Sequence, residues 1–279
     1  WVIDQYSQTI YKVDSGENVF CSVDIPWLSE DPTSGTLSAG AGHTGASSSQ
    51  PIALDFEGGS LLPGLRQAQL QIKTDTPVAV PAVPVTLTVR FLDVPDDNQF
   101  QAFIYGAAGQ GVMFGGTPVC SDNLHFCPNG VVTRADMAGY LFRAIHGLNT
   151  PPPVYQNIYG DVSFNDYNAF YIQGITDDGI TVGCGQGNYC PTAPNTRAQM
   201  SVLIYKGQHG STPPPPCTPP GVFADVPCPG GFAVDYIEAL AAEGVTAGCG
   251  GGNFCPNANI TNGQMAVFLV KGFNIPYLP

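Results

Sequence analysis

One four-residue pattern occurs three times in the sequence, as Thr133-Arg134-Ala135-Asp136, as Thr196-Arg197-Ala198-Gln199 and as Thr261-Asn262-Gly263-Gln264. Each copy opens with a threonine and has an acid or an amide three residues later, which is typical of the capping box at a helix start. A stripe of apolar residues with helical periodicity follows each copy. The pattern therefore predicts three helices that begin at the same point of a repeated unit.

The same order of features precedes each capping threonine. An aromatic-x-Asp-Val opening leads into an apolar helical stretch, then a glycine with an apolar residue after it, then a short loop bounded by two cysteines. The openings contain Asp93, Asp161 and Asp225, and the glycine steps are Gly111-Val112, Gly179-Ile180 and Gly244-Val245. Such a glycine is typical of a helix end, where the next side chain folds back on the last turn. The capping threonines are 63 and 65 residues apart, so the sequence predicts three tandem copies of a two-helix unit.

Nine cysteines indicate the compartment. A metal site would need short Cys-x2-Cys spacing with further Cys or His ligands, and the four histidines do not join the cysteines at such spacing. We therefore expect disulfides, and hence an exported protein that is extracellular or at the cell surface. The expected pairs are Cys120–Cys127, Cys184–Cys190, Cys249–Cys255 and Cys217–Cys228, with Cys21 unpaired within the chain.

In these motifs the region 91–275 resembles the S-layer homology family of bacterial surface proteins. The resemblance implies a mainly α pseudo-threefold prism with repeats at 91–150, 151–216 and 217–279, whose grooves bind cell-envelope polysaccharide. The glycan-binding residues that it implies are Arg134, Arg197, Asp93, Asp161, Asp225, Gly115, Gly183 and Gly248. The third repeat departs from the family by having Asn262 where the first two have arginine.

Each of these residues also has a structural interpretation. The acids are suited to turns or caps, the arginines to a solvated first helical turn, and the glycines to backbone conformations that other residues avoid.

Residues 1–90 show short strand-like runs separated by Pro and Gly turns, a pattern that favours a β-sandwich. The run from Ile25-Pro26-Trp27-Leu28-Ser29 to residues 83–89 resembles an Ig-like module of large secreted bacterial proteins. The expected fold is therefore an all-β Ig-like sandwich followed by the helical prism. Residues 1–14 either complete the sandwich, belong to an upstream domain, or exchange with another chain as an added strand.

Composition excludes several classes of function. The chain has 279 residues, nine basic against 22 acidic, and a net charge of −13. So few basic residues cannot neutralise a nucleic-acid backbone or bind the protein to an anionic membrane surface. No apolar run is long enough to span a bilayer. The sequence has no nucleophile elbow, and its glycine-rich stretch at 183–187 leads into an aromatic-Cys-Pro loop rather than a helix. We therefore expect no enzyme activity, no cofactor and no metal site.

The leading hypothesis is a non-enzymatic surface protein attached through its repeats to envelope glycan or to the surface layer. The first alternative is a self-assembling subunit of a filament, tube or lattice that binds copies of itself. The second is the C-terminal part of a larger secreted hydrolase. Residues 91–279 hold five basic and 13 acidic side chains. An anionic module is poorly suited to an anionic wall polymer, which favours protein–protein assembly or a neutral glycan.

Overall fold

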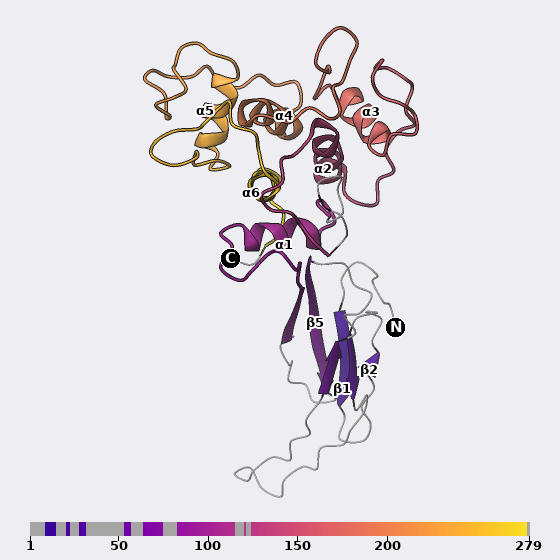
Figure 1. Cartoon of the computed structure of the whole chain (residues 1–279). Coiled ribbons are helices and arrows are strands. Elements are labelled where there is room, and N and C mark those ends of the chain that lie inside the picture. Colours follow the sequence, from indigo (N-terminus) through magenta and orange to yellow (C-terminus); the bar gives the residue numbers. More distant parts are fainter. Residues whose placement is uncertain are drawn as a thin grey trace, which may run out of the picture. The chain divides into compact units, whose positions relative to one another are not determined.

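The computed structural model describes residues 9–14, 21–22, 28–31, 53–56, 64–74, 83–114, 120 and 124–277. The chain divides into two units, Trp1–Val89 and Arg90–Pro279. In the described residues, the first unit consists of β-strands and the second of six α-helices (Figure 1).

The strands of the first unit form one mixed sheet and one strand pair. The four-stranded sheet has the order β2-β1-β5-β6, in which β1 and β5 run parallel and the other neighbours are antiparallel. The remaining two strands, β3 and β4, pair with each other in antiparallel fashion. The strands are β1 (Thr9–Asp14), β2 (Cys21–Ser22), β3 (Leu28–Asp31), β4 (Ala53–Phe56), β5 (Gly64–Thr74) and β6 (Val83–Val89).

The expectation of an all-β Ig-like sandwich is wrong. Such a fold needs two packed antiparallel sheets of at least seven strands. The described part of the chain instead has six strands, with a parallel β1–β5 pair, and from Arg90 onward it has six helices and no sheet. Alternating side chains indicate where a strand lies but not which strand it pairs with or in which direction, so the prediction failed at pairing. On both of its edges β1 has a partner within its own chain, and residues 1–8 lie outside the described part.

The second unit alternates short and long helices. The short ones are α1 (Gln101–Gly109), α3 (Ala169–Asp177) and α5 (Val234–Ala242). The long ones are α2 (Arg134–His146), α4 (Arg197–His209) and α6 (Asn262–Gly272). Each long helix begins with a full capping box, formed by Thr133 with Asp136, Thr196 with Gln199 and Thr261 with Gln264. Each short helix is followed by a glycine at positive φ, namely Gly111, Gly179 and Gly244.

The helices form a closed ring. The long helix of each pair packs against the short helix of the next pair, which gives the contacts α2–α3, α4–α5 and α6–α1 (Figure 1). The long helices also contact each other, α2 with α4 and α4 with α6. The contact between the last helix and the first joins the two ends of the helical unit.

Three backbone hydrogen bonds hold the centre of this ring. Asn195 donates to Val132, Val132 donates to Ile260, and Ile260 donates to Asn195, at N–O distances of 2.9–3.0 Å. All three residues are fully buried and immediately precede the capping threonines. Because no water reaches these groups, each N–H and C=O needs a protein partner, and the three segments supply one another.

Candidate functional site

The first residue of each long helix reaches into the cysteine loop of the next pair in the ring. The Arg134 Nε donates to the Tyr189 carbonyl at 2.7 Å, and the Arg197 Nε donates to the Phe254 carbonyl at 2.7 Å. Asn262 does the same with its amide, which donates to the Cys127 carbonyl at 3.1 Å. We name three junctions after the helix contacts beside these side chains. Arg134 belongs to the α4–α5 junction, Arg197 to the α6–α1 junction and Asn262 to the α2–α3 junction.

Of the two arginines at this position, Arg197 is the more deeply buried. Its side chain is 3% exposed, and its guanidinium lies 4.7 Å from the Phe254 ring centre and 5.4 Å from that of Phe268. Its Nη2 is buried and has no hydrogen-bond partner in the described part of the chain. Burial lowers the pKa of Arg197, and the charge of Asp225 opposes this shift. A buried guanidinium nitrogen without a partner is costly, and Arg197 Nη2 is one of the few such atoms in the described residues.

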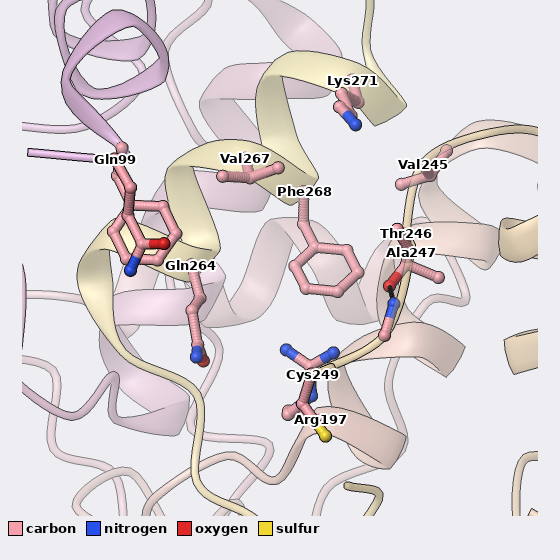
Figure 2. Close-up of a pocket in the computed structure, with 12 residues that line it drawn as sticks. Gln99, Arg197, Val245, Thr246, Ala247, Cys249, Gln264, Val267, Phe268 and Lys271 are labelled. Atoms are coloured by element: carbon pink, nitrogen blue, oxygen red, sulfur yellow. Dashed lines mark hydrogen bonds between the residues drawn. The ribbon is translucent and has the colours of Figure 1, made fainter. Parts of the chain in front are cut away.

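A cavity of about 330 Å³ opens beside Arg197 at the α6–α1 junction. Figure 2 shows the side chains of Arg197, Gln264 and Phe268 converging on it, with Lys271 one turn farther along α6. Two cations and no acid are among its lining residues. The full lining is Gln99, Phe100, Arg197, Val245, Thr246, Ala247, Gly248, Cys249, Gln264, Val267, Phe268 and Lys271. Such a mixture of apolar walls and a few convergent polar groups is typical of small-ligand sites.

The α4–α5 junction repeats this chemistry. Arg134 is 9% exposed and lies 4.8 Å from the centre of the Tyr189 ring, whose hydroxyl donates to the Arg134 carbonyl. Burial raises the pKa of Tyr189 well above its ordinary value. Counted from the capping threonine and the glycine step, the positions of Thr246, Gln264 and Lys271 are held here by Thr181, Gln199 and Lys206.

The α2–α3 junction has different groups at the same positions. Asn262 stands in place of the arginine, and the buried Asp136 stands in place of Gln264. Arg143 stands in place of Lys271 and is itself buried. Its Nε donates to the Val112 carbonyl at 3.0 Å, and its guanidinium lies 5.1–5.7 Å from the ring centres of Phe114, Tyr140 and Tyr171.

The three opening acids bind their own loops. Each carboxylate accepts two consecutive backbone N–H groups, from the aromatic residue and the cysteine of its own repeat, at 2.7–2.8 Å. The pairs are Asp93 with Phe126 and Cys127, Asp161 with Tyr189 and Cys190, and Asp225 with Phe254 and Cys255. The acids thereby fix the loop carbonyls that receive Asn262, Arg134 and Arg197.

Two of the expected glycines are needed for backbone geometry. Gly183 and Gly248 have φ of +83° and +87°, and an added Cβ would lie 2.3 Å from the carbonyl oxygen of Asn188 or Asn253. Their N–H groups donate to Thr181 and Thr246. Gly248 also lines the α6–α1 cavity. Gly115 lies outside the described residues.

Four disulfides join the cysteine pairs that the sequence spacing indicates, Cys120–Cys127, Cys184–Cys190, Cys217–Cys228 and Cys249–Cys255. The side chain of Cys21 lies outside the described part. Asp161 brings a carboxylate near Cys184 and Cys190, but both sulfurs are consumed in a disulfide and are not metal ligands. Across the described residues, no helix has the length and apolar character needed to traverse a bilayer.

Sequence reasoning missed several groups of the cavity. Gln99, Thr246, Gln264 and Lys271 were not among the expected site residues. A signal for three of them was present, since Thr181, Gln199 and Lys206 recur at the same offsets one repeat earlier. Gln99 belongs to the first repeat and reaches the cavity only because α1 packs against α6.

Comparisons with known proteins bear on this region. Over 117 residues, 41% of this chain, the sequence is 28% identical to an endoglucanase of Bacillus sp. (strain KSM-635). The match covers only 12% of that relative's length. Residues 225–266 match the family model of the S-layer homology domain, which spans α5, the Cys249–Cys255 loop and the start of α6. The chain thus contains an S-layer homology domain at residues 225–266, and this domain supplies one wall of the α6–α1 cavity.

Proposed function

We propose that the helical unit is a module of three S-layer homology repeats that anchors the protein to the cell surface by binding envelope polysaccharide. The matched domain at residues 225–266 suggests surface anchoring, and the four disulfides are consistent with an extracellular protein. The recurrence of capping boxes, acid-to-loop hydrogen bonds and glycine steps in all three helix pairs supports extending the assignment from one repeat to three.

One observation carries the proposal. The Arg197 Nη2 is buried without a partner beside a cavity that also holds Lys271 and is lined by no acidic residue. The unit as a whole is acidic, yet this cavity is locally cationic. A charged donor of this kind favours a saccharide that bears an acidic group, because charge-assisted hydrogen bonds are about twice as strong as neutral ones.

The expected site residues divide into two roles. Arg134 and Arg197 contact the glycan directly. The acids Asp93, Asp161 and Asp225, together with Gly183 and Gly248, shape the loops that position them.

Binding of the purified protein to isolated cell envelopes tests the proposal. Arg197→Ala removes a charge-assisted hydrogen bond worth about 1.5–3 kcal/mol, so we expect binding to weaken by at least about 10-fold. Arg197→Lys keeps the charge but loses the planar fork and should bind at an intermediate level.

Arg90→Ala is the matched control, because this arginine is exposed, pairs with Asp96 and is not among the residues that line the cavity. Thermal unfolding of each variant shows whether the fold is retained. Envelope binding by folded Arg197→Ala that equals the wild-type level would overturn the proposal.

A second proposal is that this module anchors a larger secreted hydrolase. The endoglucanase match supports it, although that match covers a small fraction of the relative. An antibody against the helical unit should then detect a native polypeptide much larger than 29.3 kDa that degrades carboxymethylcellulose in a gel overlay. A native polypeptide near 30 kDa without such activity would contradict it.

A further inference from the structure

We infer that the helical unit is bivalent: the α4–α5 and α6–α1 junctions each take one glycan ligand, and the α2–α3 junction is filled by the protein's own Arg143. This inference rests on the proposed glycan binding and adds how many ligands are bound and where.

The α4–α5 junction repeats several contacts of the α6–α1 junction, where the cavity lies. Arg134 and Arg197 each make an Nε-to-carbonyl hydrogen bond of 2.7 Å. Each guanidinium also lies over the aromatic ring at the same position of its loop. Thr181 and Thr246 accept from the glycine two residues later at the same distance of 3.2 Å. Lys206 and Lys271 then stand at the same place along α4 and α6. These shared contacts present similar chemistry to a ligand, with Tyr189 and Val182 at α4–α5 where α6–α1 has Phe254 and Ala247.

The described part of the α2–α3 junction lacks the ligand-binding donor. The Asn262 amide is already bonded to the Cys127 carbonyl, and it bears no charge. Asp136 places a buried carboxylate where the open junctions have a neutral glutamine. An acidic saccharide would therefore meet like charge there and find no free cation.

Arg143 occupies the space that a ligand uses elsewhere. Its guanidinium is bonded to Val112 and lies over three aromatic rings, those of Phe114, Tyr140 and Tyr171. At the α6–α1 junction the position of Phe114 is held by Ala247, which lines the open cavity. A small residue thus leaves room in one junction, and an aromatic residue fills the corresponding room in the other.

Two sites on one rigid ring have a consequence for attachment. A second contact with the same polymer or with a neighbouring strand becomes intramolecular once the first has formed, which typically raises apparent affinity by about 10²–10⁴-fold. The two sites belong to different junctions of a threefold ring, so they favour two strands or two branches over one short segment.

The test uses oligosaccharide released from the envelope by mild acid and fractionated to a short, monovalent size. The chain has only five arginines, so their Nε–H NMR signals are few and are assigned with single Arg→Lys variants. On titration we expect the signals of Arg134 and Arg197 to shift and that of Arg143 to stay in place. Calorimetry should give two sites in the wild type and one in either Arg134→Ala or Arg197→Ala.

The possible outcomes separate the two proposals. One site, with only the Arg197 signal shifting, overturns bivalency and leaves glycan binding intact. Three sites, or a shift of the Arg143 signal, overturn the claim that Arg143 fills the α2–α3 junction. The absence of any shift or heat overturns glycan binding itself. On intact envelopes, either single variant should bind at least about 100-fold more weakly than wild type, while its remaining site binds the oligosaccharide unchanged.

Discussion

The α6–α1 and α2–α3 junctions have the same arrangement of backbone elements, but their arginines have different surroundings. At α6–α1, Arg197 presents a buried, unpartnered Nη2 next to a cavity. At α2–α3, Arg143 is bonded to Val112 and surrounded by aromatic rings. Position within a repeat therefore does not determine what a cation does. The neighbouring side chains do, above all Phe114 in one junction and Ala247 in the other.

The same comparison bears on the inference from overall charge. A net charge of −8 over residues 91–279 argues against an acidic ligand. The α6–α1 cavity has two cations and no acid among its lining residues, because several acids of the unit are engaged elsewhere. Asp161 and Asp225, for example, accept hydrogen bonds from their own loops. Local arrangement outweighs the sum when a ligand contacts a single cavity.

The largest expected effect is on Arg143. Arg143→Ala removes a buried charged hydrogen bond and its contacts with three rings, so the free energy of unfolding should fall by about 3 kcal/mol. Urea denaturation measures this, with the exposed Arg90→Ala as a control that should change little. If Arg143→Ala is as stable as wild type, the two junctions do not differ as described, and α2–α3 counts as an open site.

A smaller effect distinguishes the middle loop from the other two. Tyr189 stands where the first and third repeats have Phe126 and Phe254, and its hydroxyl is bonded to the Arg134 carbonyl. Tyr189→Phe should cost about 1 kcal/mol at neutral pH. Because burial raises the pKa of Tyr189 in the folded protein, the unfolded chain loses this proton first as the pH rises. Stability should therefore decline above about pH 10.

The variant supplies the control for this pH dependence. Urea denaturation between pH 9 and pH 11.5 should show a shallower decline for Tyr189→Phe than for wild type. If stability falls equally with pH in the wild type and in Tyr189→Phe, Tyr189 is not the group responsible for the decline.

The smallest expected effect concerns a histidine–carboxylate contact present in two junctions. His146 lies 2.8 Å from Asp178, and His209 lies 3.0 Å from Glu243. The α6–α1 junction has the uncharged Asn274 at the histidine position. These side chains are about one-third exposed, so solvent screening limits each pair to no more than about 0.5 kcal/mol.

A double-mutant cycle of His209→Asn and Glu243→Gln measures that coupling. We expect a small favourable coupling, obtained from the unfolding free energies of the wild type, the two single variants and the double variant. A coupling of zero would show that this contact does not stabilise the folded protein.

Much of the helical unit was predictable because its signals are local. A threonine with an acid or amide three residues on marks each long-helix start, and the structure has all three capping boxes there. The cysteine pairs, with sequence separations of 6 to 11, are joined as the spacing indicates. The Ig-like sandwich was wrong, because strand runs do not encode the parallel pairing of β1 with β5.

The starts of the long helices, the pairing of the cysteines and the residues that the repeats share could all be predicted from the chain. These features depend on contacts between residues a few positions apart. The packing of the helices was needed to show that Arg197 meets a cavity, that Asn262 reaches a loop 135 residues away, and that α6 closes the ring onto α1. Those contacts depend on how whole helices pack, which contacts between residues a few positions apart do not set.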